Sequence, residues 1–509
     1  MKKKTRNTLW PLLFCGALIL GGCQAAPKQQ ASPVQSETSS TDTGNENEEE
    51  THDDIFDIEG TKTASSSNID FSDYPDGVLI DKAGTFTITG KGSGPVIVEA
   101  KKQEVTLIFD QTSIETDGLP CLYVREAGEV TLELKGENSM TMSGTAWQEA
   151  LNAAVYSRGD LRVTGDGSLS VSAAFGHAIK AKDTYSQDGG SLTLSAAEDG
   201  LHVNDAAALN TGSINVVSAG DEGIQSDGDL NIGEMTITTK STGDGIRAEN
   251  ILTIDGGTLT INSENEGIES KNALTITGGT INIQAVDDAI NAANSLEISG
   301  GDITAISSTN DGIDSNGSLI ISGGQVVSSG TRAPEMAFDT DNTPFELNGG
   351  IVIGLGSSLI SPTAYTQNVL LCSVSNLQSI QLVQNGTTLL DWSAPQTMQG
   401  QSGYLTLGVD GLKAGEAQLI LNGQSSTITV EEGVTTIGSV SFFNQGGPGG
   451  QGGQMPGGQA PDGQTPPEMP GNNRSGGNEF GRGQNQGSRP SRPGRSSAGM
   501  EDTQSSATR

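Results

Sequence analysis

Short alternations of apolar and polar residues recur through the middle of the chain every 22 or 23 positions. In residues 246–267, Ile246 and Ala248 flank one polar residue, and similar apolar pairs follow at positions 252 and 254 and at positions 259 and 261. Alternation with a period of two over four or five residues is typical of half-buried strands. Three short strands in each repeat, with no helical period, predict the coils of a parallel β-helix.

The repeat also sets limits for the domains. A Gly pair, suited to a bend with positive φ, recurs in successive coils, at Gly256-Gly257, Gly278-Gly279, Gly300-Gly301 and Gly323-Gly324. Residues 84–139 read as less regular strands and predict an N-terminal cap. We therefore predict an all-β chain with a parallel β-helix of about 22 residues per coil over 71–331 and a small C-terminal β cap over 332–443.

An acidic residue precedes the Gly-Ile or Ala-Ile step of each coil. The repeated acids are Asp199, Glu222, Asp244, Glu266, Asp288 and Asp311. The residue before each of them is acidic in three coils, which gives the pairs Glu198-Asp199, Asp221-Glu222 and Asp287-Asp288. Stacked carboxylates about 5 Å apart raise one another's pKa unless a cation neutralises them.

Two interpretations of these acids remain open. Crowded carboxylate oxygens suit Ca²⁺, which takes 6–8 oxygen ligands, and the doubly acidic coils are its best candidates. Asp and Asn before Gly are also ordinary turn formers, so the acids could equally be solvated turn residues. Glu stands at this position in two of the six coils, where turn chemistry prefers Asp or Asn, and this favours calcium.

Residues between inward-facing apolar positions should form outward columns. One column is His202, Gln225, Arg247, Glu269, Asn291 and Asp314, and the next is Asn204, Asp227, Glu249, Lys271, Ala293 and Asn316. Arg247 or Lys271 could serve as the base of a lyase beside a metal site. The alternative, which we favour, is that both cations pair with Glu249 and Glu269. His177 is interpreted as a turn residue, and three histidines do not assemble a nucleophilic triad.

The two ends of the chain predict export and anchoring. Residues 1–22 combine a basic start with a short apolar run, as a signal peptide does, and Leu20-Gly21-Gly22-Cys23 resembles a bacterial lipobox, which implies a lipid on Cys23. The acidic segment 23–70 and the Gly, Gln, Pro and Arg-rich segment 444–509 are expected to be disordered, as a tether and a tail. Cys121 and Cys372 are expected to be buried free thiols.

Charge and composition narrow the partners. The net charge of −35 argues against nucleic acid and anionic membrane surfaces and favours cations. An aromatic content of 4% leaves few rings on which neutral sugars could stack.

Several motifs together resemble the clostridial β-helix lipoproteins that bind acidic polysaccharide with calcium. They are the lipobox, the opening Ile80-Asp81-Lys82-Ala83-Gly84-Thr85-Phe86-Thr87-Ile88-Thr89-Gly90, the strand Val105-Thr106-Leu107-Ile108-Phe109-Asp110, and the repeated acid-(Gly/Ala)-Ile. The resemblance covers about Ile80 to Val430. It implies a right-handed, pectate-lyase-like β-helix that carries Ca²⁺ and binds polygalacturonate-type chains without cleavage.

The resemblance also assigns candidate residues. Asp287 and Asp288 match the metal motif best, followed by Asp199 and Asp311, whereas the Gly243-Asp244 and Asn265-Glu266 coils depart from it. The chain is expected to be a monomer, anchored to the cell membrane on its extracellular side, with the polysaccharide on the face that carries Arg247, Lys271, Asn291 and Asp314. A calcium-dependent lyase on the same fold and a calcium-rigidified adhesin are the alternatives.

Overall fold

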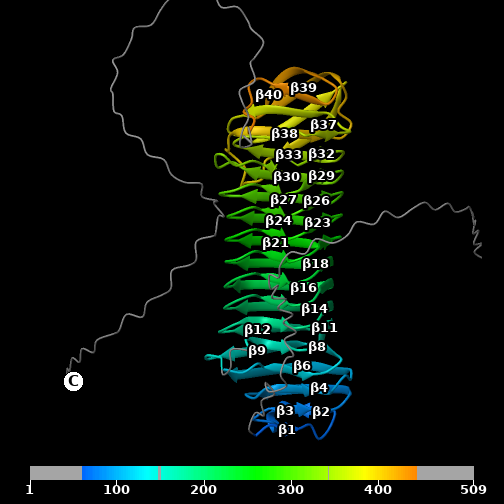
Figure 1. Cartoon of the computed structure of the whole chain (residues 1–509), viewed down its shortest axis with the longest axis vertical. Helices are drawn as coiled ribbons and strands as arrows, with labels where there is room; N and C mark the ends of the chain where they lie inside the picture. Colours follow the sequence, from blue (N-terminus) through cyan, green and yellow to red (C-terminus); the bar gives the residue numbers. More distant parts are fainter. Residues whose placement is uncertain (1–59, 147–150, 342, 444–509) are drawn as a thin grey trace, which may run out of the picture. The chain divides into compact units, whose positions relative to one another are not determined.

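The computed structural model describes residues 60–146, 151–341 and 343–443. In this part of the chain nearly all regular structure is β, and the one helical element is a 3-10 turn, η2, at Phe71–Asp73. The coils stack along the solenoid, each strand beside its equivalent in the next coil (Figure 1). The prediction of an all-β parallel solenoid is therefore confirmed.

A sheet of short parallel strands runs along one side of the solenoid. Within the described ranges it has 13 strands. In spatial order they are β1 (Lys62–Thr63), β3 (Val78–Ile80), β5 (Val96–Glu99), β7 (Leu122–Glu126), β10 (Ala153–Ser157), β13 (His177–Ala181), β15 (Leu201–Val203), β17 (Ile224–Ser226), β19 (Ile246–Ala248), β22 (Ile268–Ser270), β25 (Ile290–Ala292), β28 (Ile313–Ser315) and β31 (Phe338–Asp339). We call this the narrow sheet.

The other strands of each coil join a second, larger sheet. Its members are β2 (Asn68–Asp70), β4 (Gly84–Gly92), β6 (Val105–Asp117), β8 (Glu129–Lys135), β9 (Glu137–Ser143), β11 (Asp160–Gly165), β12 (Ser168–Ala173), β14 (Tyr185–Ala196), β16 (Ala207–Ala219), β18 (Leu230–Ser241), β20 (Leu252–Ile254), β21 (Thr258–Ser263), β23 (Ala273–Ile276), β24 (Thr280–Ala285), β26 (Ser295–Ile298), β27 (Asp302–Ser307), β29 (Ser318–Ile321), β30 (Gln325–Gly330), β32 (Phe345–Leu347), β33 (Ile351–Gly356), β34 (Ala364–Tyr365), β35 (Val369–Val374), β38 (Gly403–Val409) and β41 (Val434–Ile437).

Columns of identical apolar residues fill the interior. Ile246 pairs with Ile268 and Ile268 with Ile290, and all three side chains are fully buried. Each buried Ile contributes about 1.5–3 kcal/mol relative to an exposed one. Because an isolated coil cannot bury these side chains, stability depends on the stack.

Glycine is required at two kinds of position. The second Gly of the recurring pair has positive φ, as at Gly257 (83°), which confirms the predicted bend. Gly267, after the repeated acid, is required for close approach, since a Cβ there would lie 2.2 Å from Cγ2 of Ile283. Ala289 replaces this Gly in the next coil, where Ala305 occupies the position equivalent to Ile283. The smaller side chain of Ala305 thus leaves room for the Cβ of Ala289.

One of the 23-residue steps, from Gly200 to Gly223, contains a local bulge. Leu194 of β14 pairs with Val216 of β16, but Ser195 pairs with Ser218, so Val217 is an extra residue. Val217 is an exposed large apolar residue. Register resumes in the narrow sheet, where Leu201 pairs with Ile224.

The parallel ladder extends beyond both predicted limits. β2 already pairs with β4 and buries Ile69, so residues 60–70 belong to the stack and not to the tether. Residues 84–139, predicted as an irregular cap, form parallel coils. At the other end, β33 still pairs in parallel with β30 and is covered by antiparallel β38. A four-stranded antiparallel sheet completes the C-terminal cap, made of β36 (Ser379–Gln384), β37 (Thr387–Ser393), β39 (Gly415–Leu421) and β40 (Gln424–Val430).

Some sequence predictions lie outside the described residues. They are the signal peptide, lipidation at Cys23, the tether up to residue 59 and the tail 444–509. Cys121 and Cys372 are buried free thiols, as predicted. None of the described helical segments is long and apolar enough to cross a membrane.

Candidate functional site

The repeated acids form a continuous row beside the narrow sheet. Each acid ends the turn before a short strand. The backbone N–H of the residue directly after it donates a hydrogen bond to a carbonyl of the next coil, as the Gly245 N–H does to the Glu266 carbonyl. We call Asp199, Glu222, Asp244, Glu266, Asp288 and Asp311 the acid row. The middle residues of the strands form the outer row, in the predicted register, with Lys180, His202, Gln225, Arg247, Glu269, Asn291, Asp314 and Asp339.

The acid row is more buried than a set of solvated turns would be. Five of its six residues are buried, and Glu266 is half-buried. Burial, followed by neighbouring carboxylates, raises the pKa of Glu222 to about 7. Burial likewise raises the pKa of Asp311 to about 8 and that of Asp314, in the outer row, to about 7. These groups would favour a neutralising cation.

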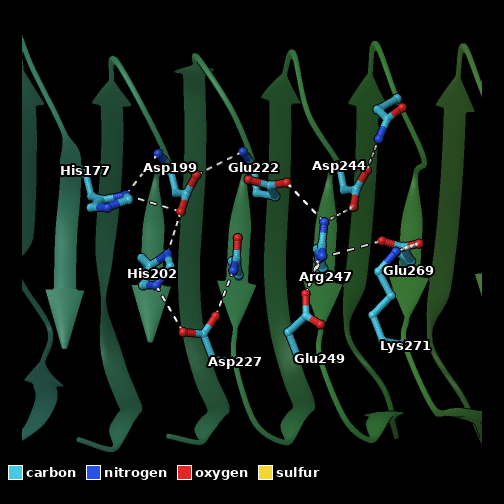
Figure 2. Close-up of polar contacts among 12 residues, drawn as sticks. His177, Asp199, His202, Glu222, Asp227, Asp244, Arg247, Glu249, Glu269 and Lys271 are labelled. Atoms are coloured by element: carbon cyan, nitrogen blue, oxygen red, sulfur yellow. Dashed lines mark hydrogen bonds and ion pairs between the residues drawn. The ribbon is translucent and has the colours of Figure 1, made fainter. Parts of the chain in front are cut away.

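The first acidic group lies where the sequence motif is weakest. Carboxylate oxygens of Asp244, Glu266 and Glu269 lie within 4.8 Å of one another. Figure 2 shows two of the three, Asp244 and Glu269. Asp244 is fully buried, and its Oδ2 has no hydrogen-bond donor, nor has Oε2 of Glu266. Burial, then the adjacent Glu266, raises the pKa of Asp244 to about 9. The motif missed this group because its third carboxylate comes from Glu269 in the outer row.

A second acidic group uses predicted residues. Oxygens of Asp199, Asp221 and Glu222 lie within 4.8 Å of one another. Oδ1 of Asp199 also accepts the Glu222 N–H at 3.1 Å. The exposed Glu198 is not a member, because its Oε2 lies 3.1 Å from Nε2 of His177.

The downstream acids are held mainly by amides. Nδ2 of Asn291 donates to Oδ2 of Asp288 at 3.0 Å and to Oδ2 of Asp314 at 3.3 Å. Oδ1 of Asp288 accepts the Asp311 N–H at 2.9 Å, and Asn310 donates to Asp287 at 2.8 Å. Burial raises the pKa of Asp288 to about 7. In the described ranges, Asp287, Asp288 and Asp311 therefore do not form a three-carboxylate group, although they matched the motif best.

Two histidines flank Asp199, and the sequence reasoning missed them. His177 is buried at the start of β13, not in a turn, and His202 belongs to the outer row. Their Nδ1 atoms lie 3.2 and 2.7 Å from Oδ2 of Asp199. Burial opposes ionisation of Asp199, but the two histidines outweigh it and hold its pKa below the usual value. The Gly-His-Ala-Ile sequence at 176–179 was the available signal.

Arg247 and Lys271, the two cations considered as lyase bases, are occupied by carboxylates. Arg247 hydrogen-bonds Glu249, and its nitrogens lie 3.6 Å from Glu222, 3.7 Å from Asp244 and 3.7 Å from Glu269. Lys271 pairs with Glu269. Burial alone would lower the pKa of Arg247, but its carboxylate neighbours raise it. This is the ion-paired arrangement that we favoured over a catalytic base.

The chain is similar to known proteins. A carbohydrate-binding domain-containing protein of Acetivibrio thermocellus is 28% identical over 128 residues, which are 23% of this chain and 45% of that protein. The chain thus spans less than half the length of this curated relative. A solved structure described as a polysaccharide lyase-like protein from C. thermocellum, a gadolinium derivative, is 24% identical, with a TM-score of 0.32 over 52% of this chain and 90% of that one.

A family model also matches the chain, over residues 75–309 and 257–447. These segments together include most of the solenoid and its C-terminal cap. The chain belongs to the family of carbohydrate-binding domain-containing proteins.

Proposed function

We propose that this solenoid binds acidic polysaccharide, of the polygalacturonate type, in a calcium-dependent manner and without cleavage. The observation that carries the proposal is the group Asp244, Glu266 and Glu269, whose buried oxygens include two without a hydrogen-bond donor. A buried carboxylate oxygen without a partner is costly. An all-oxygen, anionic donor set fits Ca²⁺.

The charge of the face explains why a cation would be needed. Glu198 and Asp221 are exposed beside the acid row, and Asp287 is half-exposed. A polyanion would be repelled by these side chains. Bound Ca²⁺ would supply positive charge that carboxylates of the protein and of uronate sugars can share. The acid row together with Glu269 would hold the cation, and the other residues of the outer row would meet the sugar.

The proposal of binding without cleavage depends on the ion pairing of Arg247 and Lys271. A lyase base must accept a proton, whereas the neighbours of Arg247 raise its pKa and keep it charged. Lys271 is likewise engaged by Glu269. Neither side chain is arranged as a free base beside the acid row.

A binding assay with matched variants tests this function. The full chain is applied to immobilised polygalacturonate with Ca²⁺ or EGTA, alongside Glu266→Gln and the control Glu297→Gln, which removes an exposed charge from β26 of the larger sheet. We expect EGTA and Glu266→Gln to abolish or strongly weaken binding and Glu297→Gln to bind normally. Binding that ignores chelation refutes calcium bridging.

Two further readouts separate the alternatives. Ultraviolet absorbance from an unsaturated uronate product would refute binding without cleavage. Calcium-dependent thermal stability without retention on any acidic polysaccharide would indicate a structural adhesin instead.

We propose, from the sequence, that Cys23 anchors the domain to the outer side of the cell membrane. Incorporation of labelled fatty acid that is lost in Cys23→Ser would support the anchor.

A further inference from the structure

The histidine pair beside Asp199 differs chemically from the two carboxylate groups. Ligand atoms of His177, Asp199 and His202 lie within 4.8 Å of one another. The two imidazole rings approach with centroids 4.7 Å apart, and both face the carboxylate of Asp199 (Figure 2). The side chains of His177 and Asp199 are 7% and 4% exposed, and that of His202 is 13% exposed. The cluster is therefore largely withdrawn from solvent, with access past His202.

Hydrogen bonding leaves an unresolved contact at the centre of this cluster. Nδ1 of His177 accepts the backbone N–H of Asp199 at 3.2 Å, and a metal ion bound to this nitrogen would take the one lone pair that this hydrogen bond uses and would break the bond. The same atom lies 3.2 Å from Oδ2 of Asp199, which is also an acceptor. Two acceptors at this distance repel each other unless a proton or a metal cation lies between them.

The outer nitrogens are held as they are in metal sites. Nε2 of His177 lies 3.1 Å from Oε2 of Glu198, and Nε2 of His202 lies 3.5 Å from Oδ2 of Asp227. Gln225 in turn donates to Oδ1 of Asp227 at 2.8 Å. Metal-ligating histidines characteristically present their second nitrogen to a carboxylate, which fixes the ring and strengthens the ligand. Both rings have that partner here.

Distances and donor types select a class of metal. Ligands about 2.1 Å from a tetrahedral ion lie roughly 3.4 Å from one another. The observed separations from Oδ2 of Asp199 are 3.2 Å to His177 and 2.7 Å to His202, so small side-chain movements would suffice. Imidazole suits Zn²⁺, Co²⁺, Ni²⁺ and Cu²⁺, whereas Ca²⁺ prefers oxygen.

We propose that His177, Asp199 and His202 form a binding site for a zinc-like divalent transition metal, with Glu198 and Asp227 as the outer partners that orient the two rings. The site lies at the upstream end of the acid row. It shares Asp199 with the acidic group of Asp221 and Glu222, but its nitrogen donors set it apart from both carboxylate groups. This inference does not rest on the proposed polysaccharide binding.

A cobalt titration tests the site without any substitution. The full chain is stripped with EDTA, equilibrated with excess Ca²⁺ to fill oxygen sites, and titrated with Co²⁺ in the absence of polysaccharide. We expect a saturable visible spectrum typical of nitrogen-containing, four- or five-coordinate cobalt, which Zn²⁺ then removes. A spectrum no stronger than that of aqueous Co²⁺, or one that Zn²⁺ does not remove, refutes the proposal.

Matched histidine variants locate the metal. We expect His177→Asn and His202→Asn each to weaken Zn²⁺ binding by about tenfold or more. The control is His52→Asn, which removes the remaining histidine of the chain, outside the described residues. Metal-free melting curves in EDTA verify that each variant is folded. Unchanged affinity in folded His177→Asn and His202→Asn protein would show that the rings are joined to Asp199 by protons only, and would overturn the site.

Discussion

The substitution Asp244→Asn should change the stability of the protein in opposite directions with and without calcium. Asn copies the protonated carboxyl in shape and charge, and the side chain at this position is fully buried. In EGTA, we expect Asp244→Asn to be more stable than the parent at neutral pH. In saturating Ca²⁺ we expect it to be less stable, because one ligand charge of the proposed site is missing.

The magnitude follows from the raised pKa of Asp244. The ordinary pKa is 3.8, and burial with Glu266 raises the folded value to about 9. Between these values the folded state holds a proton that the unfolded state releases, so stability is complete below pH 3.8 and decreases as pH rises towards 9. The slope is about 1.4 kcal/mol per pH unit for one group. From pH 5 to pH 7, the parent should lose about 3 kcal/mol relative to Asp244→Asn.

Urea unfolding at pH 5 and pH 7, with EGTA or Ca²⁺, measures all four differences. The control is Asp302→Asn, an exposed position of β27 whose substitution should show no reversal. The raised pKa costs the parent about 4.4 kcal/mol at pH 7, so a cation at about 10,000 times its dissociation constant, which adds about 5.5 kcal/mol, is needed to invert the order of the two proteins. If Asp244→Asn is destabilising in EGTA at pH 7, Arg247 already neutralises the carboxylate of Asp244. The group of Asp244, Glu266 and Glu269 then needs no bound cation.

Three further predictions test packing, accessibility and the outer row. Gly267→Ala should cost about 1–3 kcal/mol of unfolding free energy, and adding Ile283→Ala should give a double-mutant loss smaller than the sum of the two single losses; strict additivity would contradict the proposed contact. Burial raises the pKa of the Cys121 thiol to about 11 and that of Cys372 to about 12, so peptide mapping should find both labelled by a thiol reagent only in urea, and native labelling at pH 8 would contradict their burial. Lys271→Gln should weaken polygalacturonate binding by no more than about fivefold, because Lys271 is half-exposed and already paired with the buried Glu269, and complete loss would assign Lys271 a larger function than its pairing with Glu269 implies.

The sequence predicted the coil and its columns because both depend on a fixed period. Once Ile246, Ile268 and Ile290 are in register, Arg247 and Glu269 must be neighbours, and the structure pairs them. The period does not say how deeply a turn residue is buried. The acid row is therefore more buried than its Asp-Gly steps suggested.

Which side chains come together in the carboxylate groups and the histidine cluster depends on how closely the acid row and the outer row approach each other. Adjacent acids such as Asp287 and Asp288 gave the stronger sequence motif, yet amides of Asn291 and Asn310 satisfy their oxygens. Glu269 and the two histidines joined the acid row from positions that the motif does not include. The small Ala305 is a similar case. It takes the position of Ile283, whose Cγ2 would lie 2.2 Å from a Cβ at Gly267, and the sequence alone does not show that these two positions meet.

The bulge at Val217 has a consequence for how such a chain can change over evolutionary time. One added residue leaves the stack at the outside of β16, and the pairing of Leu201 with Ile224 is unaffected. Insertions at that corner can therefore accumulate without displacing any ligand. Each coil can also change its acid, amide or imidazole side chain independently of the others, because the hydrogen bonds that hold neighbouring coils together are made by the backbone. Such a solenoid can acquire different cation preferences coil by coil while its architecture stays constant.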